Sequence, residues 1–425
     1  MKITEIKSDL LNEKYYQINH DSGLTIYVYE KPDYNSTYAI FGTKYGSINR
    51  TFSKDGEKVT TVPDGIAHFL EHKLFEAEEG DAFTRYAKTG ANANAYTSFD
   101  KTCYLFSCTE NFEESLTILL DFVQSPYFTK ETVDKEQGII GQEIKMYDDS
   151  PSWRVMFNML EAMYENHPVK IDIAGTVESI AKITPEYLYS CYNTFYNLHN
   201  MVLCVAGKAT VDDVLKVADK MLKKSEKHTV ESVFEKELSS VSQHYVEQKL
   251  PVALPLFNFG YKENAEHRPS AKETAYTDIL LFMLASQNSK MYRDLLDNNL
   301  INSSFSYEFF EGEGFACTMF GGESRNPKAA AKMIADYIEK AKNDGIDESE
   351  FEIAKKSVYG EIVSSLNSVD SIANMIADGH FSKKELYSYI EAVANAKISN
   401  IESRLDFLMN KDYSVLSVIN GMEDL

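Results

Sequence analysis

The spacing of hydrophobic and polar residues predicts strands and helices that alternate along the first half of the chain. Alternating or continuous apolar runs predict strands near residues 24–31, 36–47, 94–108 and 201–206. Apolar residues that recur every three or four positions predict helices near residues 64–76, 81–88, 111–124, 129–147, 151–165, 185–196 and 210–224. This mixture is typical of α+β layers, in which long helices pack on a sheet.

A polar stretch rich in Glu, Ser and Lys, residues 226–248, predicts a linker between two domains. After it the chain restarts with an apolar strand near 252–261 and a helix near 268–286. We therefore expect an N-terminal domain at residues 1–225 and a C-terminal domain at 249–425.

Two pieces of the second half match the first half in register. Residues 129–144 align with 347–362, and residues 202–207 align with 416–421. Long-period similarity of this kind predicts two homologous α+β domains, each with a mixed or antiparallel sheet and helices packed on it.

The helix predicted near residues 64–76 carries the pattern H-x-x-E-H, formed by His68, Glu71 and His72. With about 3.6 residues per turn, the two histidines stand one above the other on one face, and Glu71 lies beside them. Two such imidazoles can bind one zinc ion while the carboxylate reaches a water, which is the inverzincin arrangement. The alternative is an amphipathic helix whose histidines make ordinary hydrogen bonds.

A catalytic zinc site needs a third protein ligand, and Glu143 in the helix predicted near 129–147 is the candidate. Glu136 stands seven residues earlier, two turns away, and therefore shares a face with Glu143. One glutamate can bind the metal while the other supports it from outside. A glutamate on a helix is more often simply solvated, so Glu143 is a candidate ligand only because the H-x-x-E-H motif calls for a third one.

With these residues the sequence resembles the pitrilysin/insulinase family of zinc peptidases, and especially its short-chain branch with the mitochondrial processing peptidases and many bacterial peptidases. His68, Glu71, His72, Glu136 and Glu143 fall on the family's motif positions. Further agreement comes from residues 90–104, His167-Pro168 with Gly175, residues 183–186, and Tyr196 with residues 200–207. The resemblance covers the whole first half and is weaker in the second.

The resemblance implies a fold and a mechanism. The domains are expected to face each other like a clamshell around an inner chamber, and only the first would hold metal, because residues 277–284 offer no imidazole where the motif helix should be. In the match between the two halves of the chain, Glu361 of the second domain aligns with Glu143 of the first. Glu71 would act as the base.

The family also places an Arg–Tyr pair from the second domain beside the developing oxyanion, with the tyrosine seven residues after the arginine. Arg293 matches the arginine, but Leu300 stands seven residues later, and Tyr307 is the substitute that we expect in space. An ordinary surface ion pair is the alternative role of Arg293.

Residues 90–104 can offer a sheet edge to which an extended peptide adds as another strand. The substrate-binding candidates are Asn94, Ala95, Tyr96 and Thr97. The alternative is that the asparagines at 92 and 94 only form a turn after Gly90.

Composition narrows the class of protein. A net charge of −22 argues against nucleic acid as a partner. The start of the chain has no apolar h-region and no apolar run approaches the length of a membrane span, which favours the cytoplasm and no membrane contact. The five cysteines are scattered without C-x-x-C spacing, which predicts reduced, buried thiols.

Three functions therefore compete. The sequence favours a zinc-dependent endopeptidase that acts on unfolded peptides or small proteins. The second possibility is a non-catalytic peptide-binding or scaffold subunit of a heterodimeric peptidase, and the third is a binding module with a closed zinc site, which would need a fourth ligand. A homodimer, or a heterodimer with a metal-free sister subunit, is expected to complete the chamber.

Overall fold

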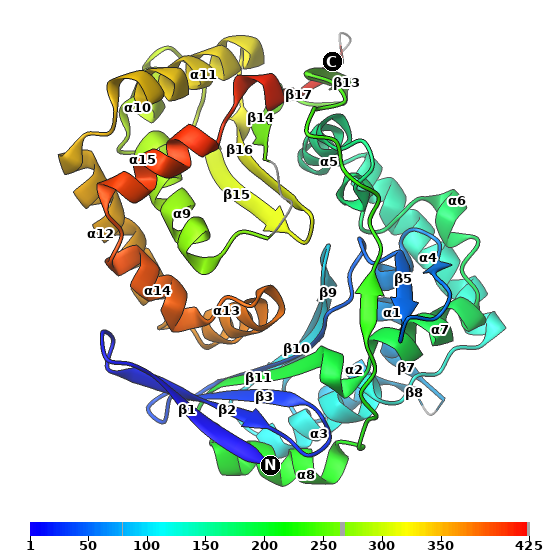
Figure 1. The fold of residues 1–425 in the computed structure, drawn as a ribbon. Helices are drawn as coiled ribbons and strands as arrows, with labels where there is room; N and C mark the ends of the chain where they lie inside the picture. The colour runs from blue at the N-terminus through cyan, green and yellow to red at the C-terminus, as the bar shows by residue number, and fades with distance from the viewer. Residues whose placement is uncertain (79, 264–267, 423–425) are drawn as a thin grey trace. The chain divides into compact units, whose positions relative to one another are not determined.

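The computed structural model describes residues 1–78, 80–263 and 268–422, which form two compact units (Figure 1). Unit 1 comprises residues 1–144, 172–233 and 363–387, and unit 2 comprises residues 145–171, 234–362 and 388–425. The predicted domains, 1–225 and 249–425, were drawn as continuous stretches, whereas each compact unit takes one segment from the other half of the chain. Part of the predicted C-terminal domain, residues 264–267 and 423–425, lies outside the described residues.

Unit 1 is built on a mixed sheet with the strand order β1-β2-β3-β11-β4-β10-β9. Its strands are β1 (Lys2–Ser8), β2 (Glu13–Asn19), β3 (Thr25–Glu30), β4 (Thr37–Thr43), β9 (Asn92–Thr97), β10 (Thr102–Cys108) and β11 (Met201–Gly207). β11 runs parallel to β3, and the other neighbours are antiparallel. Every residue of β11 is buried, as expected for a strand that is covered on both faces.

Helices cover both faces of the unit 1 sheet. One face is covered by α1 (Ile66–Leu74), α3 (Phe112–Val123), α7 (Pro185–Phe195) and α8 (Val211–Met221). The other face is covered by α13 (Val369–Ser382), which comes from the second half of the chain and packs on β4 and β11 (Figure 1). Around this core lie α2 (Ala82–Tyr86), α4 (Lys130–Asp148), α6 (Val177–Ile180) and the short strands β5 (Thr51–Lys54), β6 (Thr60–Thr61), β7 (Glu76–Ala77), β8 (Gly80–Asp81) and β12 (Val230–Ser232).

Unit 2 repeats this plan with the strand order β13-β17-β14-β16-β15. Its strands are β13 (Tyr245–Lys249), β14 (Leu256–Lys262), β15 (Ser306–Gly312), β16 (Phe315–Glu323) and β17 (Ser414–Asn420). Helix α5 (Pro151–Met163), from the first half of the chain, packs on β14 and β17. The other helices are α9 (Ala271–Ala285), α10 (Lys290–Asp297), α11 (Pro327–Asp344), α12 (Glu348–Ser365), α14 (Leu386–Ala394) and α15 (Ile398–Phe407).

The two sheets share one topology, which confirms the predicted α+β fold with two homologous domains. The series β13-β17-β14-β16-β15 matches β3-β11-β4-β10-β9 strand by strand, with the same single parallel pair at the start of each series. Position 260 requires glycine, because a Cβ there would lie 2.7 Å from the Thr318 carbonyl oxygen of β16 and also close to the ends of the Met163 and Met159 side chains of α5.

Two predictions of local structure were wrong, and two strands were not predicted. The single strand predicted near 94–108 is the hairpin β9–β10, closed by a turn in which the Ser98 N–H donates to the Lys101 carbonyl at 2.8 Å. Serine and aspartate within residues 98–101 favour such a turn. The segment predicted as a linker contributes β12, which pairs with β5, and most of β13, which pairs with β17. Strands β1 and β2 were not predicted: β1 is exposed along most of its length, and the buried residues of β2, Tyr15 and Ile18, are three positions apart and do not show the alternation of a strand.

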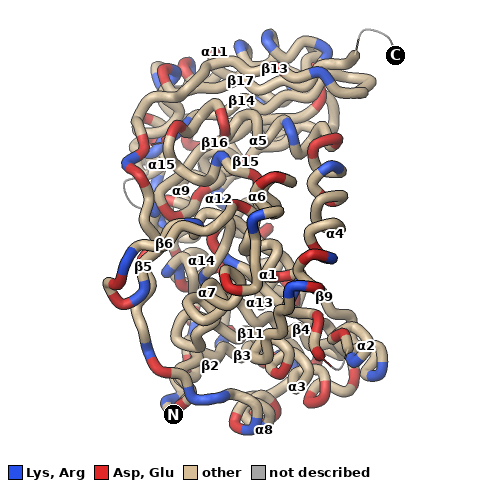
Figure 2. The backbone as a smooth tube through the Cα atoms, turned by 90° about the vertical axis from the view of Figure 1, so that its right-hand side faces the viewer, with Lys and Arg blue, Asp and Glu red and all other residues tan. Residues whose placement is uncertain are grey.

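Charged residues of both signs are distributed along the chain, and α4 carries both (Figure 2). Across the described residues, no helix combines the length and the apolar composition that crossing a bilayer requires.

Candidate metal centre

Helix α1 places the H-x-x-E-H motif at the edge of the unit 1 core. Apolar residues such as Phe69 and Leu70 are fully buried and fix the helix against its surroundings. The helix begins after Gly65, whose φ is 86° and whose Cβ, if present, would lie against the Ala174 carbonyl. Glycine is therefore needed for the chain to enter α1 at this angle.

The structure brings His68, His72 and Glu143 together. Their potential ligand atoms all lie within 4.8 Å of one another. Nε2 of His68 lies 3.7 Å from Oε1 of Glu143, and Nε2 of His72 lies 3.5 Å from Oε2. The two imidazoles come from successive turns of α1, with ring centroids 4.6 Å apart, while the carboxylate comes from α4.

Glu136 supports this cluster from the side of α4. Its Oε1 lies 3.1 Å from Nδ1 of His72, and its side chain is buried. This contact favours the tautomer of His72 that carries its proton on Nδ1 and leaves the Nε2 lone pair free for a ligand bond. Burial would raise the pKa of Glu136, but the bond to His72 and the charges of His72, Lys73 and Lys135 together outweigh it and lower the pKa.

His68 has the electronic state of a good metal ligand. Burial, and secondarily the neighbouring His72, lower the pKa of His68 to about 4. The ring is therefore neutral at neutral pH, and a neutral imidazole is what a metal ion binds. Two imidazole nitrogens and one carboxylate oxygen form a donor set that fits Zn²⁺ with three protein ligands.

Glu71 points into the same buried region and is 8% exposed. Burial raises its pKa to about 7, although His72 and a hydrogen bond from Thr97 act in the opposite direction. The Thr97 hydroxyl donates to Oε2 of Glu71 at 3.0 Å. This bond could not be predicted from the sequence, because it depends on how β9 lies against α1.

The predicted substrate strand is β9, the last strand in the order of the unit 1 sheet. Asn94 is exposed, and its Oδ1 accepts the N–H of Ala95 at 2.9 Å. Tyr96 directs its hydroxyl to Oδ1 of Asn374 on α13, at 3.1 Å. Asn94 and its neighbours thus form a strand rather than the turn that was the alternative prediction.

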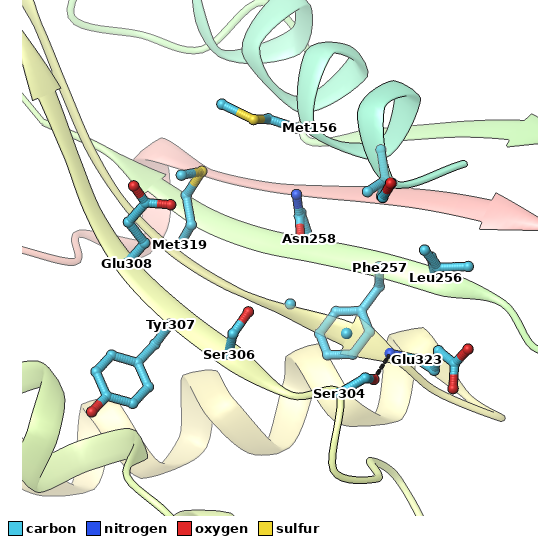
Figure 3. Close-up of a pocket in the computed structure, with 14 residues that line it drawn as sticks. Met156, Leu256, Phe257, Asn258, Ser304, Ser306, Tyr307, Glu308, Met319 and Glu323 are labelled. Carbon is cyan, nitrogen blue, oxygen red and sulfur yellow. Dashed lines mark hydrogen bonds between the residues drawn. The ribbon is translucent and has the colours of Figure 1, made fainter. Parts of the chain in front are cut away.

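Arg293 and Tyr307 belong to unit 2, so their role beside the metal cluster stays a prediction. Arg293 lies on α10 and donates from Nε to the Ser289 carbonyl at 3.3 Å. Tyr307 lies on β15, and burial raises its pKa to about 12. It lines a cavity of about 380 Å³, in which its ring points away from Phe257 and Asn258 (Figure 3).

Comparison with known proteins identifies the family. The family model for insulinase (peptidase family M16) matches residues 60–177, and the model for the peptidase M16 inactive domain matches residues 182–358. The chain is 39% identical to the uncharacterized zinc protease YmfH of Bacillus subtilis, over 94% of this chain and 95% of the relative. The chain belongs to the M16 peptidase family. The resemblance seen in the sequence is thereby confirmed.

Solved structures agree with this M16 assignment. A crystal structure described as an M16-like peptidase, from Alicyclobacillus acidocaldarius, is similar with a TM-score of 0.93 and 34% identity over 99% of each chain. A Pseudomonas fluorescens structure described as a peptidase M16 inactive domain has a TM-score of 0.78 over 99% of this chain and 98% of its own. At 13% identity, the second likeness shows the fold alone.

Proposed function

We propose that this M16 protein is a zinc-dependent endopeptidase that hydrolyses unfolded peptides or small proteins. The observation that carries the proposal is the convergence of His68, His72 and Glu143, with the buried carboxylate of Glu71 beside them. The zinc-protease names of relatives such as YmfH support it.

His68, His72 and Glu143 would hold the zinc ion, which when bound supplies Lewis acidity and lowers the pKa of water to about 7. Glu71 accepts the proton of the attacking water and later delivers it to the leaving nitrogen. In the metal-free chain burial raises the pKa of Glu71 to about 7, and the charge of a bound zinc ion would lower it, which keeps the carboxylate ionised as a base at neutral pH. Thr97 holds one oxygen of Glu71 and so fixes the direction of its carboxylate.

Substrate would bind to β9 through its main chain. An edge strand carries N–H and C=O groups that can pair with an added extended peptide. This mode requires a substrate that is extended, which is why we propose unfolded peptides. Main-chain binding of this kind contacts few side chains of the substrate, so we expect the protein to accept peptides of many sequences.

The second candidate function is a non-catalytic peptide-binding subunit. The observation that favours it is the departure from the family's Arg–Tyr spacing, with Leu300 where the tyrosine belongs. A homodimer, or a heterodimer with a metal-free sister subunit, would supply the missing groups, and the molecular mass of the purified chain with and without such a partner tests this.

Zinc content and cleavage of a quenched, unstructured peptide distinguish these functions. We expect about one zinc ion per chain and peptide cleavage by the wild type. Glu71→Gln should keep the zinc and lose cleavage, since it removes only the base, while Glu131→Gln on the exposed side of α4 serves as the matched control. Zinc binding without cleavage by the wild type would favour the peptide-binding subunit, and cleavage retained by Glu71→Gln would remove Glu71 from the mechanism.

A further inference from the structure

Helix α13 belongs by sequence to the second half of the chain but covers one face of the unit 1 sheet. Its apolar face is buried, through residues such as Ile372, Ile376 and Phe381. Phe381 packs so closely on β4 that a Cβ at Gly42 would lie 3.0 Å from its ring. Asn374 and Asp378 lie one turn apart on α13 and therefore share a different face of the helix.

These two polar residues of α13 bind the β9–β10 hairpin. Oδ1 of Asn374 accepts the Tyr96 hydroxyl at 3.1 Å, and its Nδ2 donates to the Tyr38 hydroxyl of β4 at 3.4 Å. Asp378 pairs with Lys101 at 2.7 Å, and the Lys101 side chain is only 17% exposed. Tyr96 and Lys101 stand on either side of the turn, so α13 holds the hairpin at the end nearest the metal cluster.

The same strand segment holds the proposed base from the opposite face. Successive residues of a strand point to opposite faces, so Thr97 faces α1 while Tyr96 faces α13. Thr97 donates to Glu71, and the residue paired with it across the hairpin, Thr102, donates to the Tyr45 carbonyl at 2.8 Å. A displacement of β9 would therefore move the hydroxyl that orients Glu71.

We infer that α13 positions Glu71 for catalysis, with Asn374 and Asp378 as positioning residues that act through Tyr96, Lys101 and Thr97. The inference rests on the proposed peptidase function. The side-chain bonds described for Asn374 and Asp378 go to Tyr96, Tyr38 and Lys101 and not to the metal cluster, so each residue acts by fixing the place of β9.

A role in packing alone is the alternative, and the chain offers a matched control. The Tyr15 hydroxyl on β2 donates to Glu385 at 2.6 Å, so it ties the segment that follows α13 to the far side of the same sheet. Between β2 and β9 lie β3, β11, β4 and β10. Tyr96→Phe and Tyr15→Phe each remove one partly buried hydroxyl bond between the same two parts of unit 1.

The test combines kinetics with hydrogen exchange in the full-length chain. We expect Tyr96→Phe to lower kcat by up to about fivefold, because the bond lost is of ordinary strength but misplaces the hydroxyl that orients the base. KM should rise as well, since the substrate is proposed to bind along the same strand. Amides of residues 92–97 should exchange faster in the same variant, and zinc content should stay unchanged. Tyr15→Phe removes a shorter bond to a carboxylate, so it should lower the midpoint of unfolding at least as much and leave kcat and these amides as in the wild type.

Variants that alter the ion pair between Lys101 and Asp378 provide a second, independent test. Lys101→Met should reproduce the loss of kcat, and Lys101→Arg, which keeps the charge, should restore it. Unchanged exchange in both Tyr96→Phe and Lys101→Met would overturn the inference, as would faster exchange with unchanged kcat, or an equal loss of kcat in Tyr15→Phe. A wild type without peptidase activity would refute the proposed function instead, while the exchange rates would still decide whether α13 restrains β9.

Discussion

Replacing Glu136 by glutamine tests how the outer carboxylate of the cluster contributes to metal affinity. Glutamine keeps the shape of the side chain and an oxygen for the Nδ1 proton of His72, but it removes the negative charge. The carboxylate lies 3.1 Å from Nδ1 and is 5% exposed, so the charge acts with little screening by water. Loss of the charge-assisted part of such a bond costs about 1–1.5 kcal/mol.

This energy corresponds to zinc affinity about 10-fold weaker, near the lower end of the range for residues that support metal ligands. Glu143→Gln removes a ligand, so its loss should exceed about 100-fold, the upper end of that range. Glu71→Gln should leave the affinity as in the wild type, because Glu71 is not a ligand in the proposed site.

Competition with a chromophoric chelator measures the zinc Kd of each variant, and Glu131→Gln on the same helix is the matched control. The expected order of Kd is Glu143→Gln above Glu136→Gln, with Glu71→Gln and the control equal to the wild type. Equal Kd values for Glu136→Gln and Glu143→Gln would mean that both are ligands, and no change in either would refute the proposed site.

Three further predictions concern the base, its partner and the entry to α1. Burial raises the pKa of Glu71 to about 7 from its usual 4.5, so the folded metal-free chain retains a proton that the unfolded chain has released between these pH values. The free energy of unfolding of the wild type should therefore fall by about 3 kcal/mol, relative to that of Glu71→Gln, as the pH rises from 4.5 to 7. Denaturant titrations measure both proteins, and a difference between them that does not change with pH would contradict this prediction. Thr97→Val should lower kcat/KM about fivefold at unchanged zinc content, because one hydrogen bond to Glu71 is lost, and peptide cleavage measures the effect. Gly65→Ala should cost about 2–4 kcal/mol in denaturant unfolding, because it adds a clash with the Ala174 carbonyl to the strain of a positive φ. Gly56→Ala, which meets nothing within 4 Å, carries the strain alone and should cost about 1 kcal/mol.

Those parts of the site that depend on local geometry were predictable from the sequence. Helix spacing alone places His68 and His72 on one face, and the seven-residue separation places Glu136 and Glu143 on one face of α4. The pairing of the two helices came from the resemblance to the M16 family, because no local rule relates residues so far apart. The structure agrees with that pairing.

Contacts between distant segments were beyond a local pattern. The bond between Tyr96 and Asn374 joins residues separated by 278 positions, and nothing near either residue signals the other. The bond from Thr97 to Glu71 depends on how β9 lies against α1. Residues 369–382, which form α13, were predicted to lie in the C-terminal domain, residues 249–425, since continuity of sequence is the only guide before the packing is known.

The place of α13 limits how the gene can be divided. A fragment that ended at the predicted linker would lack Ile372, Ile376 and Phe381, and uncovering what they bury would cost roughly 1.5–3 kcal/mol for each side chain. That sum is comparable to the whole stability of an ordinary protein domain. The second half of the chain depends in the same way on Met159 and Met163 of α5, which are fully buried. Neither half of the chain therefore forms a stable protein by itself. Recombination between distant relatives at the linker should yield insoluble chimaeras, unless each covering helix and the sheet beneath it come from the same parent.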